Sequence, residues 1–142
     1  MLGSAVDISS DSVFRENRAF PNSDDFNQPA RGGAISVHSG CVLEISNSIV
    51  ESNSANIGGA ISVFDGSLEA TAVDFKRNQA IGERDGSGVG GAVALEVSPD
   101  KIIPVLNTGT RFFHMIFEAL ECNFVRNVAT LRGGPSPEKL PL

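Results

Sequence analysis

The sequence predicts an all-β chain, and three observations support this prediction. The tetrapeptide Gly-Gly-Ala-Ile or Gly-Gly-Ala-Val occurs three times, beginning at Gly32, Gly58 and Gly90, and a further Gly-Gly pair begins at Gly133. A Phe or Val followed three positions later by Asn recurs in alternation with this tetrapeptide. Between the two motifs, apolar residues alternate in short runs bounded by Gly, Asn, Asp or Ser, which is the period of a β-strand.

The spacing of the motifs predicts the architecture. The Gly-Gly pairs lie 26, 32 and 43 residues apart, and such periods indicate a solenoid, a propeller or an array. Each apolar run is only about three to five residues long, which is too short for a helix. A propeller blade needs four longer strands joined by hairpins, whereas two or three short strands per unit are expected here. A parallel β-helix remains, with about four coils.

The coil boundaries follow from the motifs. We expect coils at about 1–31, 32–57, 58–89 and 90–132, and a disordered tail at 135–142 that is rich in proline. The longest insertions fall at 21–31, 82–89 and 98–113. The apolar run from Phe112 to Leu120 also fits helical spacing, but alignment with Leu43 and Leu68 favours a strand from Phe117 onward, with the part from Phe112 to Ile116 as an apolar patch.

Equivalent residues of successive coils should stack in columns. Gly-Gly suits a corner where the backbone needs a positive φ or lies against the next coil. Ile35, Ile61 and Val93 should form an inward aliphatic column, and stacked Asn side chains can hydrogen-bond along their own column. The residues predicted to define the repeat are Gly32, Gly33, Gly58, Gly59, Gly90, Gly91, Phe14, Phe75, Phe124, Asn17, Asn53, Asn78 and Asn127, with Val50 in the place of a Phe.

The alternation of GGA[IV] with FxxN resembles the repeat of the polymorphic outer-membrane proteins, which are autotransporter adhesins. The resemblance covers roughly residues 5 to 134. It implies a right-handed, pectin-lyase-like β-helix, a location outside the cell or on its outer surface, and adhesion to a host-surface or matrix protein or glycan through the corner loops. The chain lacks the secretion signal and translocator barrel of that family, so we expect it to be a piece of a longer polypeptide or a truncated gene product.

Composition narrows the range of partners. The net charge is −6 and the Lys and Arg residues are scattered, which argues against a nucleic-acid partner. No run of 18 apolar residues occurs, so we expect no membrane span in this segment. Trp and Tyr are absent, which argues against an aromatic platform for stacking sugars.

Candidate chemistry is sparse. Gly86 to Gly91 matches GxGxxG, but the residues after it predict a strand where a dinucleotide site needs a helix. Glu44, Glu69 and Glu118 occupy one repeat position and should form an outward column, either solvated or bridged by a cation. Glu69, Asp74, Lys76 and Arg77 form the only density of charged residues that could serve a polysaccharide lyase or hydrolase.

The remaining reactive residues predict no site. His38 and His114 fall in different coils without a partner at metal-ligand spacing, and Cys41 and Cys122 fall in different columns, so we expect neither a metal site nor a disulfide. We therefore predict no catalytic residues, no cofactor and no metal. The functional prediction is a non-catalytic segment of an adhesin-like protein, with a fragment of a carbohydrate-active enzyme as the alternative.

Overall fold

The computed structural model describes residues 4–21, 28–82, 88–98 and 116–131. Within these ranges the chain forms short β-strands and turns and no helix. Every pairing between the described strands is parallel. The prediction of an all-β chain is confirmed.

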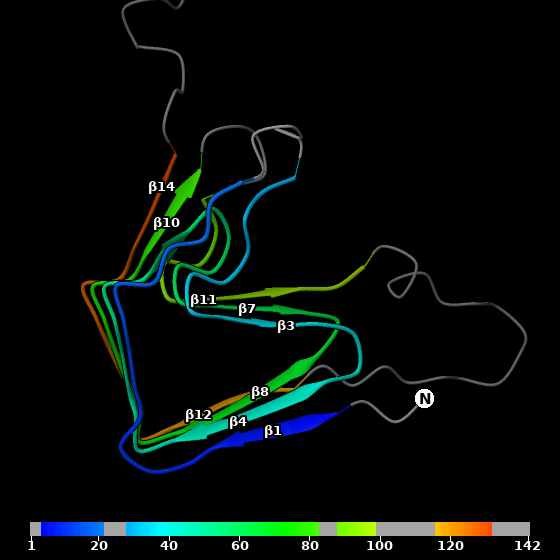
Figure 1. Cartoon of the computed structure of the whole chain (residues 1–142), viewed down its shortest axis with the longest axis vertical. Coiled ribbons are helices and arrows are strands. Elements are labelled where there is room, and N and C mark those ends of the chain that lie inside the picture. Colours follow the sequence, from blue (N-terminus) through cyan, green and yellow to red (C-terminus); the bar gives the residue numbers. More distant parts are fainter. Residues whose placement is uncertain (1–3, 22–27, 83–87, 99–115, 132–142) are drawn as a thin grey trace, which may run out of the picture.

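The strands lie in four layers that follow one another along the chain (Figure 1). The first layer holds β1 (Ala5–Ile8) and β2 (Val13–Arg15). The second holds β3 (Ile35–Val37), β4 (Val42–Ser46), β5 (Ile49–Glu51) and β6 (Ser54–Ala55). The third holds β7 (Ile61–Phe64), β8 (Ser67–Thr71), β9 (Asp74–Lys76) and β10 (Gln79–Gly82), and the fourth holds β11 (Val93–Glu96), β12 (Phe117–Leu120), β13 (Asn123–Val125) and β14 (Val128–Leu131).

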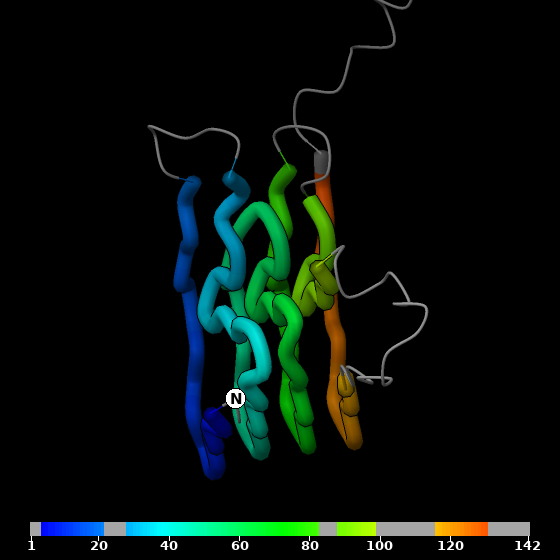
Figure 2. The backbone as a smooth tube through the Cα atoms, turned by 90° about the vertical axis from the view of Figure 1, so that its right-hand side faces the viewer, coloured from blue at the N-terminus to red at the C-terminus, as the bar shows by residue number. Residues whose placement is uncertain are grey.

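Each strand pairs with its counterparts in the adjacent layers, which gives four sheets: β1-β4-β8-β12, β2-β5-β9-β13, β3-β7-β11 and β6-β10-β14. Figure 2 shows the layers side by side in chain order, from blue to orange. The prediction of two or three strands per unit is wrong, because layers two to four each hold four. The strand that was missed follows the Asn corner and begins with polar residues, Ser54 and Gln79, so it shows little hydrophobic alternation.

The core lies between the sheets and is built from residues in register. Leu43 and Leu68 are paired and buried, as are Ile45 and Ala70. Ile35, Ile61 and Val93 are paired in one column, with Ile61 fully buried in the middle. Phe14, Val50, Phe75 and Phe124 form another column, in which the rings of Phe75 and Phe124 stack with centroids 4.7 Å apart.

Left-handed backbone conformation turns the chain at two corners of each layer. The residue before each column Asn has a φ between 53° and 57°, and this position is occupied by Glu16, Ser52, Arg77 and Arg126. A second set of corner residues, two positions before β2, β5, β9 and β13, has φ between 47° and 54° and consists of Asp11, Asn47, Ala72 and Glu121. Residues other than Gly are strained in the left-handed region of positive φ, so the interlayer pairing must hold them in this conformation.

The two positions of each Gly-Gly pair require glycine for different physical reasons. Gly32, Gly58 and Gly90 have φ between 62° and 66°. The second glycine faces the next layer instead: a Cβ on Gly33 would lie 2.2 Å from the Gly59 carbonyl oxygen, and one on Gly59 would lie 2.1 Å from that of Gly91. The layers are therefore spaced too closely at this corner for any side chain.

The third and fourth layers regain their register after the insertions. Gly82 pairs with Leu131, and Val89 again pairs with Ile57. Glu96 pairs with Phe64, and Phe117 pairs with Leu68, which confirms the predicted strand from Phe117 onward. The predicted tail at 135–142, the GxGxxG residues before Gly88, Gly133, His114, residues 112–115 and most of the three insertions lie outside the described residues.

Candidate functional site

The four Asn residues form a continuous hydrogen-bonded column. The Oδ1 of Asn53 accepts the backbone N–H and the Nδ2 of Asn17, both at 3.0 Å, and the Oδ1 of Asn78 accepts the same two groups of Asn53. Asn127 does the same for Asn78. Each Nδ2 from Asn53 onward also donates to a strand carbonyl of the preceding layer, at Phe14, Val50 and Phe75. The column thus satisfies backbone groups that the Asn corner would otherwise leave unpaired.

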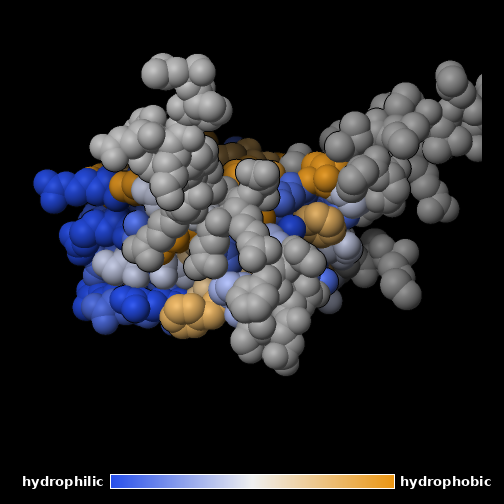
Figure 3. All heavy atoms as spheres, turned by 90° about the horizontal axis from the view of Figure 1, so that it is seen from above, coloured by the Kyte–Doolittle hydropathy of each residue, from blue (hydrophilic) through white to orange (hydrophobic). Residues whose placement is uncertain are grey.

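A charged face runs along β2, β5, β9 and β13. Its central residue is Glu51, whose two carboxylate oxygens pair with Arg15 of the first layer at 2.5 Å and with Arg77 of the third at 2.7 Å. The Glu51 side chain is only 10% exposed, while both arginines are more than half exposed. Seen from above, the hydrophilic side chains gather along the left edge of the stack, where the sheets containing β9 and β10 meet (Figure 3). Glu51 therefore connects three layers.

Asp74 and Lys76 form a second ion pair on this face. The Lys76 Nζ donates to one Asp74 oxygen at 2.6 Å, and the Nδ2 of Asn123 donates to the other at 2.8 Å. The hydrogen bond from Lys76, followed by that from Asn123, lowers the pKa of Asp74 below its ordinary value of 3.8. Asp74 is thus a carboxylate at neutral pH, a state in which it cannot act as a general acid.

The lowered pKa of Asp74 predicts a pH dependence of stability. The stability that this carboxylate contributes is present above pH 3.8 and is lost as the pH falls through its pKa in the folded protein. We therefore expect Asp74→Asn to lose less stability than the wild type between about pH 5 and about pH 2, measured by urea unfolding. Glu44→Gln is the control, because Glu44 is exposed and has no hydrogen bond or ion pair with a described residue. Equal acid losses in Asp74→Asn and the wild type would contradict this assignment.

The acidic column lies on another face, along β1, β4, β8 and β12. Glu44, Glu69 and Glu118 are in register as predicted, and Asp7 continues the column into the first layer. Glu44 and Glu118 are exposed and Glu69 is half-buried. None of the three glutamates has a hydrogen bond or an ion pair with another residue of the described ranges.

Sequence reasoning missed a cluster around Phe64. Arg31 pairs with Glu96 at 2.8 Å, and its guanidinium lies 5.7 Å from the centre of the Phe64 ring. The His38 ring lies beside the Phe64 ring, with centroids 6.5 Å apart and planes tilted by 49°. Its Nε2 lies 3.0 Å from the hydroxyl oxygen of Ser36. Arg31 and Glu96 are 65 positions apart in the sequence, and neither belongs to a motif. Only the layer register brings them together.

The other reactive residues are placed apart. Cys41 and Cys122 are free and half-buried, and the Cys122 thiol donates to the Leu120 and Ala70 carbonyls at 3.3 and 3.5 Å. Among the described residues, no group of three or more His, Cys, Asp or Glu is arranged to hold a metal ion. Of the four residues considered for catalysis, Asp74, Lys76 and Arg77 lie on the charged face in ion pairs, while Glu69 lies in the acidic column.

A scan against protein-family models, a search of curated proteins and a search of solved structures each found no match to this chain. The part of the chain that the structure describes contains no helix long and apolar enough to cross a membrane.

Proposed function

We propose that the four layers are coils of a right-handed parallel β-helix, and that this coil stack is a non-catalytic scaffold of an adhesin-like protein. In this proposal the coils hold the insertions in fixed positions. The insertions contact a host-surface or matrix protein or glycan outside the cell.

One observation carries the non-catalytic part of the proposal. The charged residues best suited to acid–base chemistry neutralise one another: Glu51 pairs with two arginines and Asp74 pairs with Lys76. A lyase needs a base and cations that are free to contact a uronate. On this face Glu51 instead joins three layers and Asp74 accepts from Asn123 of the fourth layer, while Lys76 pairs with Asp74 within β9, which is a structural use.

The register around the insertions supports the scaffold part. In the third layer, only Asp65 and Gly66 lie between Phe64, which pairs with Glu96, and Ser67, whose hydroxyl accepts the Ile116 N–H. In the fourth layer, residues 97–115 separate Glu96 from Ile116. The strands on both sides of this long insertion still pair with the third layer. A stack that accepts insertions without losing register can vary its loops independently of its core.

The test replaces residues 97–115 with Asp-Gly, the connection that the third layer uses. We expect this variant to lose attachment to cultured cells or to matrix-coated plates while keeping its β-sheet circular dichroism. Glu69→Gln and Arg77→Ala serve as matched surface variants and should attach like the wild type. The same proteins are incubated with a panel of uronate polymers, with and without Ca²⁺, to detect unsaturated products.

One outcome would change the binding surface that we propose, and a second would overturn the proposal. Attachment that survives the Asp-Gly replacement would remove this insertion from the binding surface. Polymer cleavage by the wild type that Glu69→Gln or Arg77→Ala eliminates would assign the charged residues to catalysis and favour a carbohydrate-active enzyme.

A further inference from the structure

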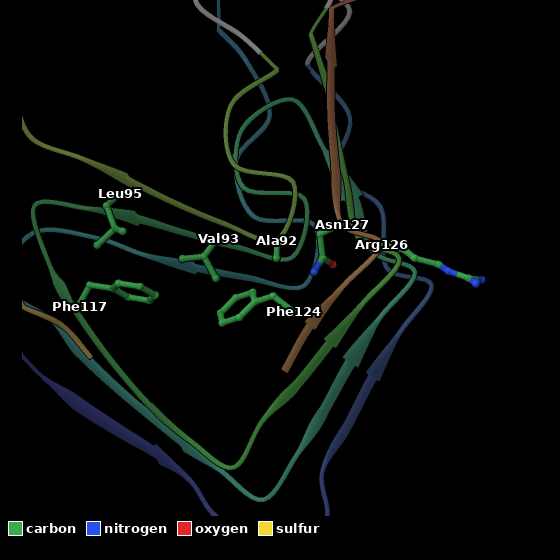
Figure 4. A pocket seen from close by; sticks show the side chains of 7 residues that line it. All are labelled: Ala92, Val93, Leu95, Phe117, Phe124, Arg126 and Asn127. Carbon is green, nitrogen blue, oxygen red and sulfur yellow. The ribbon is translucent and has the colours of Figure 1, made fainter. Parts of the chain in front are cut away.

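The fourth layer exposes the interior of the stack. Its inward residues Phe117 and Phe124 are 43% and 48% exposed, whereas their counterparts in the third layer, Leu68 and Phe75, are fully buried. Figure 4 shows both rings pointing into a hollow that Ala92, Val93, Leu95 and Asn127 complete, while Arg126 points away from it. The volume of this hollow is about 350 Å³. Within the described residues no strand pairs with the outer edges of β11, β12, β13 and β14.

The first layer exposes the opposite end of the same columns. Val6, which is in register with Leu43, is 52% exposed, and Ile8 and Phe14 are only partly buried. The outer edges of β1 and β2 are likewise unpaired in the part of the chain that the structure describes. The two ends therefore present the same inward positions: Val6 corresponds to Phe117, Ile8 to Ala119 and Phe14 to Phe124.

The Asn column gives the two ends complementary polarity. At the first-layer end, Asn17 uses its N–H and Nδ2 as donors to Asn53, and its Oδ1 accepts no hydrogen bond from a described residue. At the fourth-layer end, Asn127 uses its Oδ1 to accept from Asn78, and its backbone N–H donates none within the described residues. One end thus offers an acceptor and the other a donor, at the same position of the column.

The exposed charges on this corner are also complementary. Glu16 of the first layer and Arg126 of the fourth occupy equivalent positions, immediately before the column Asn, and both are exposed. Asp7 and Glu118 are equivalent like charges, but the stack already contains this arrangement at the Glu44 and Glu69 positions. At the position before the column Asn the two ends therefore carry opposite charges, whereas Asp7 and Glu118, and likewise Asp11 and Glu121, are equivalent like charges.

We propose that the fourth-layer end of one copy binds the first-layer end of a second copy, so that the chains associate head to tail in parallel. Val6 and Phe14 of the second copy cover Phe117 and Phe124, Asn17 Oδ1 accepts from Asn127, and Glu16 pairs with Arg126. The unpaired strand edges favour such an association, because an open parallel edge is a template for another strand. The interface joins two different surfaces, so each added copy leaves both kinds of end open.

The test uses one charge at each end. Val6→Lys places a charge at an inward position of the first-layer end, and Ala119→Lys places one at an inward position of the fourth-layer end. Because Ala119 is exposed, its longer replacement displaces little packing. Leu120→Lys is the control: Leu120 is as exposed as Val6 but is in register with the exposed Thr71, so its side chain lies on the outward face. Circular dichroism verifies that each variant folds.

Sedimentation velocity should show wild-type mass rising with concentration beyond a dimer. Val6→Lys and Ala119→Lys should each self-associate at least about tenfold more weakly, because an unpaired charge would be buried, while Leu120→Lys behaves like the wild type. An equimolar mixture of the two blocked variants should form a dimer and no larger species, because each keeps one intact end. A wild type that stays monomeric, a Val6→Lys variant that associates like the wild type, or a mixture that stays monomeric would overturn the proposal.

Discussion

Gly59→Ala is expected to destabilise the protein by more than about 3 kcal/mol, because the added methyl group has no space to occupy. Its Cβ would lie 2.1 Å from the Gly91 carbonyl oxygen, 2.5 Å from the carbonyl carbon of Gln79 and 2.7 Å from the Gln79 nitrogen. All three are backbone atoms, so no rotamer change relieves the contact. The third and fourth layers would have to separate at this corner, and Gly59 would also have to move away from Gln79 of its own layer.

That separation would weaken more than one contact. The Gly59 N–H donates to the Gly90 carbonyl at 2.9 Å, and both Ala60 and Ile61 donate to the Ala92 carbonyl at 2.8 and 2.9 Å. These interlayer hydrogen bonds lie next to Ile61, which is fully buried. A shift of the backbone at Gly59 therefore opens both the hydrogen-bonded edge and the apolar column.

Urea unfolding followed by circular dichroism measures the effect, and Gly86→Ala is the control. This variant adds the same methyl group in the insertion that separates Gly82 from Val89, and we expect it to change stability by less than about 1 kcal/mol. Similar unfolding midpoints for the two variants would show that the Gly59 corner is not a close contact between layers.

Sequence periodicity predicted the columns but not every strand. Stacked positions such as Phe75 and Phe124 repeat with the motifs, so their register could be inferred from the spacing of the motifs alone. The strands β6 and β10 could not, because they are short and begin with Ser54 and Gln79. The corner at Ala72 and Glu121 also gave no signal, since neither residue favours a positive φ, and the interlayer contacts impose it.

The ion pairs show where a stronger prediction was possible. Arg15, Glu51 and Lys76 occupy the second position of three successive copies of the FxxN motif, with alternating charge. Stacking those copies predicts a pair between Arg15 and Glu51, which the structure contains. Lys76 instead pairs with Asp74 within its own strand, and Arg77 from the next position reaches Glu51. Register alone therefore predicts which charges are neighbours, but not which partner each one takes.

Asn78→Ala is expected to cost about 3 kcal/mol or more, because its amide serves three neighbours in the middle of the stack. Asn78 is fully buried, and its Oδ1 accepts both the backbone N–H and the Nδ2 of Asn53, while its Nδ2 donates to the Val50 carbonyl at 2.8 Å and to Asn127 at 3.0 Å. Alanine would leave the buried Asn53 N–H without its acceptor and would take one of its donors from the Val50 carbonyl, which also lies in the β5–β9 ladder. A buried group left without a partner costs about 1 to 3 kcal/mol.

Asn17→Ala is the matched variant, because Asn17 occupies the same column at its exposed end. Its side chain makes one hydrogen bond to a described residue, from Nδ2 to the Oδ1 of Asn53, and that oxygen keeps the Asn17 backbone N–H as a donor. No buried group of the described chain loses its partner, so we expect a loss of less than about 1 kcal/mol. Urea titrations of both variants measure the difference between a central and a terminal amide. If the two losses were equal, the stability of the column would not come from hydrogen bonds passed between layers, and the corners would have to be held by the apolar columns alone.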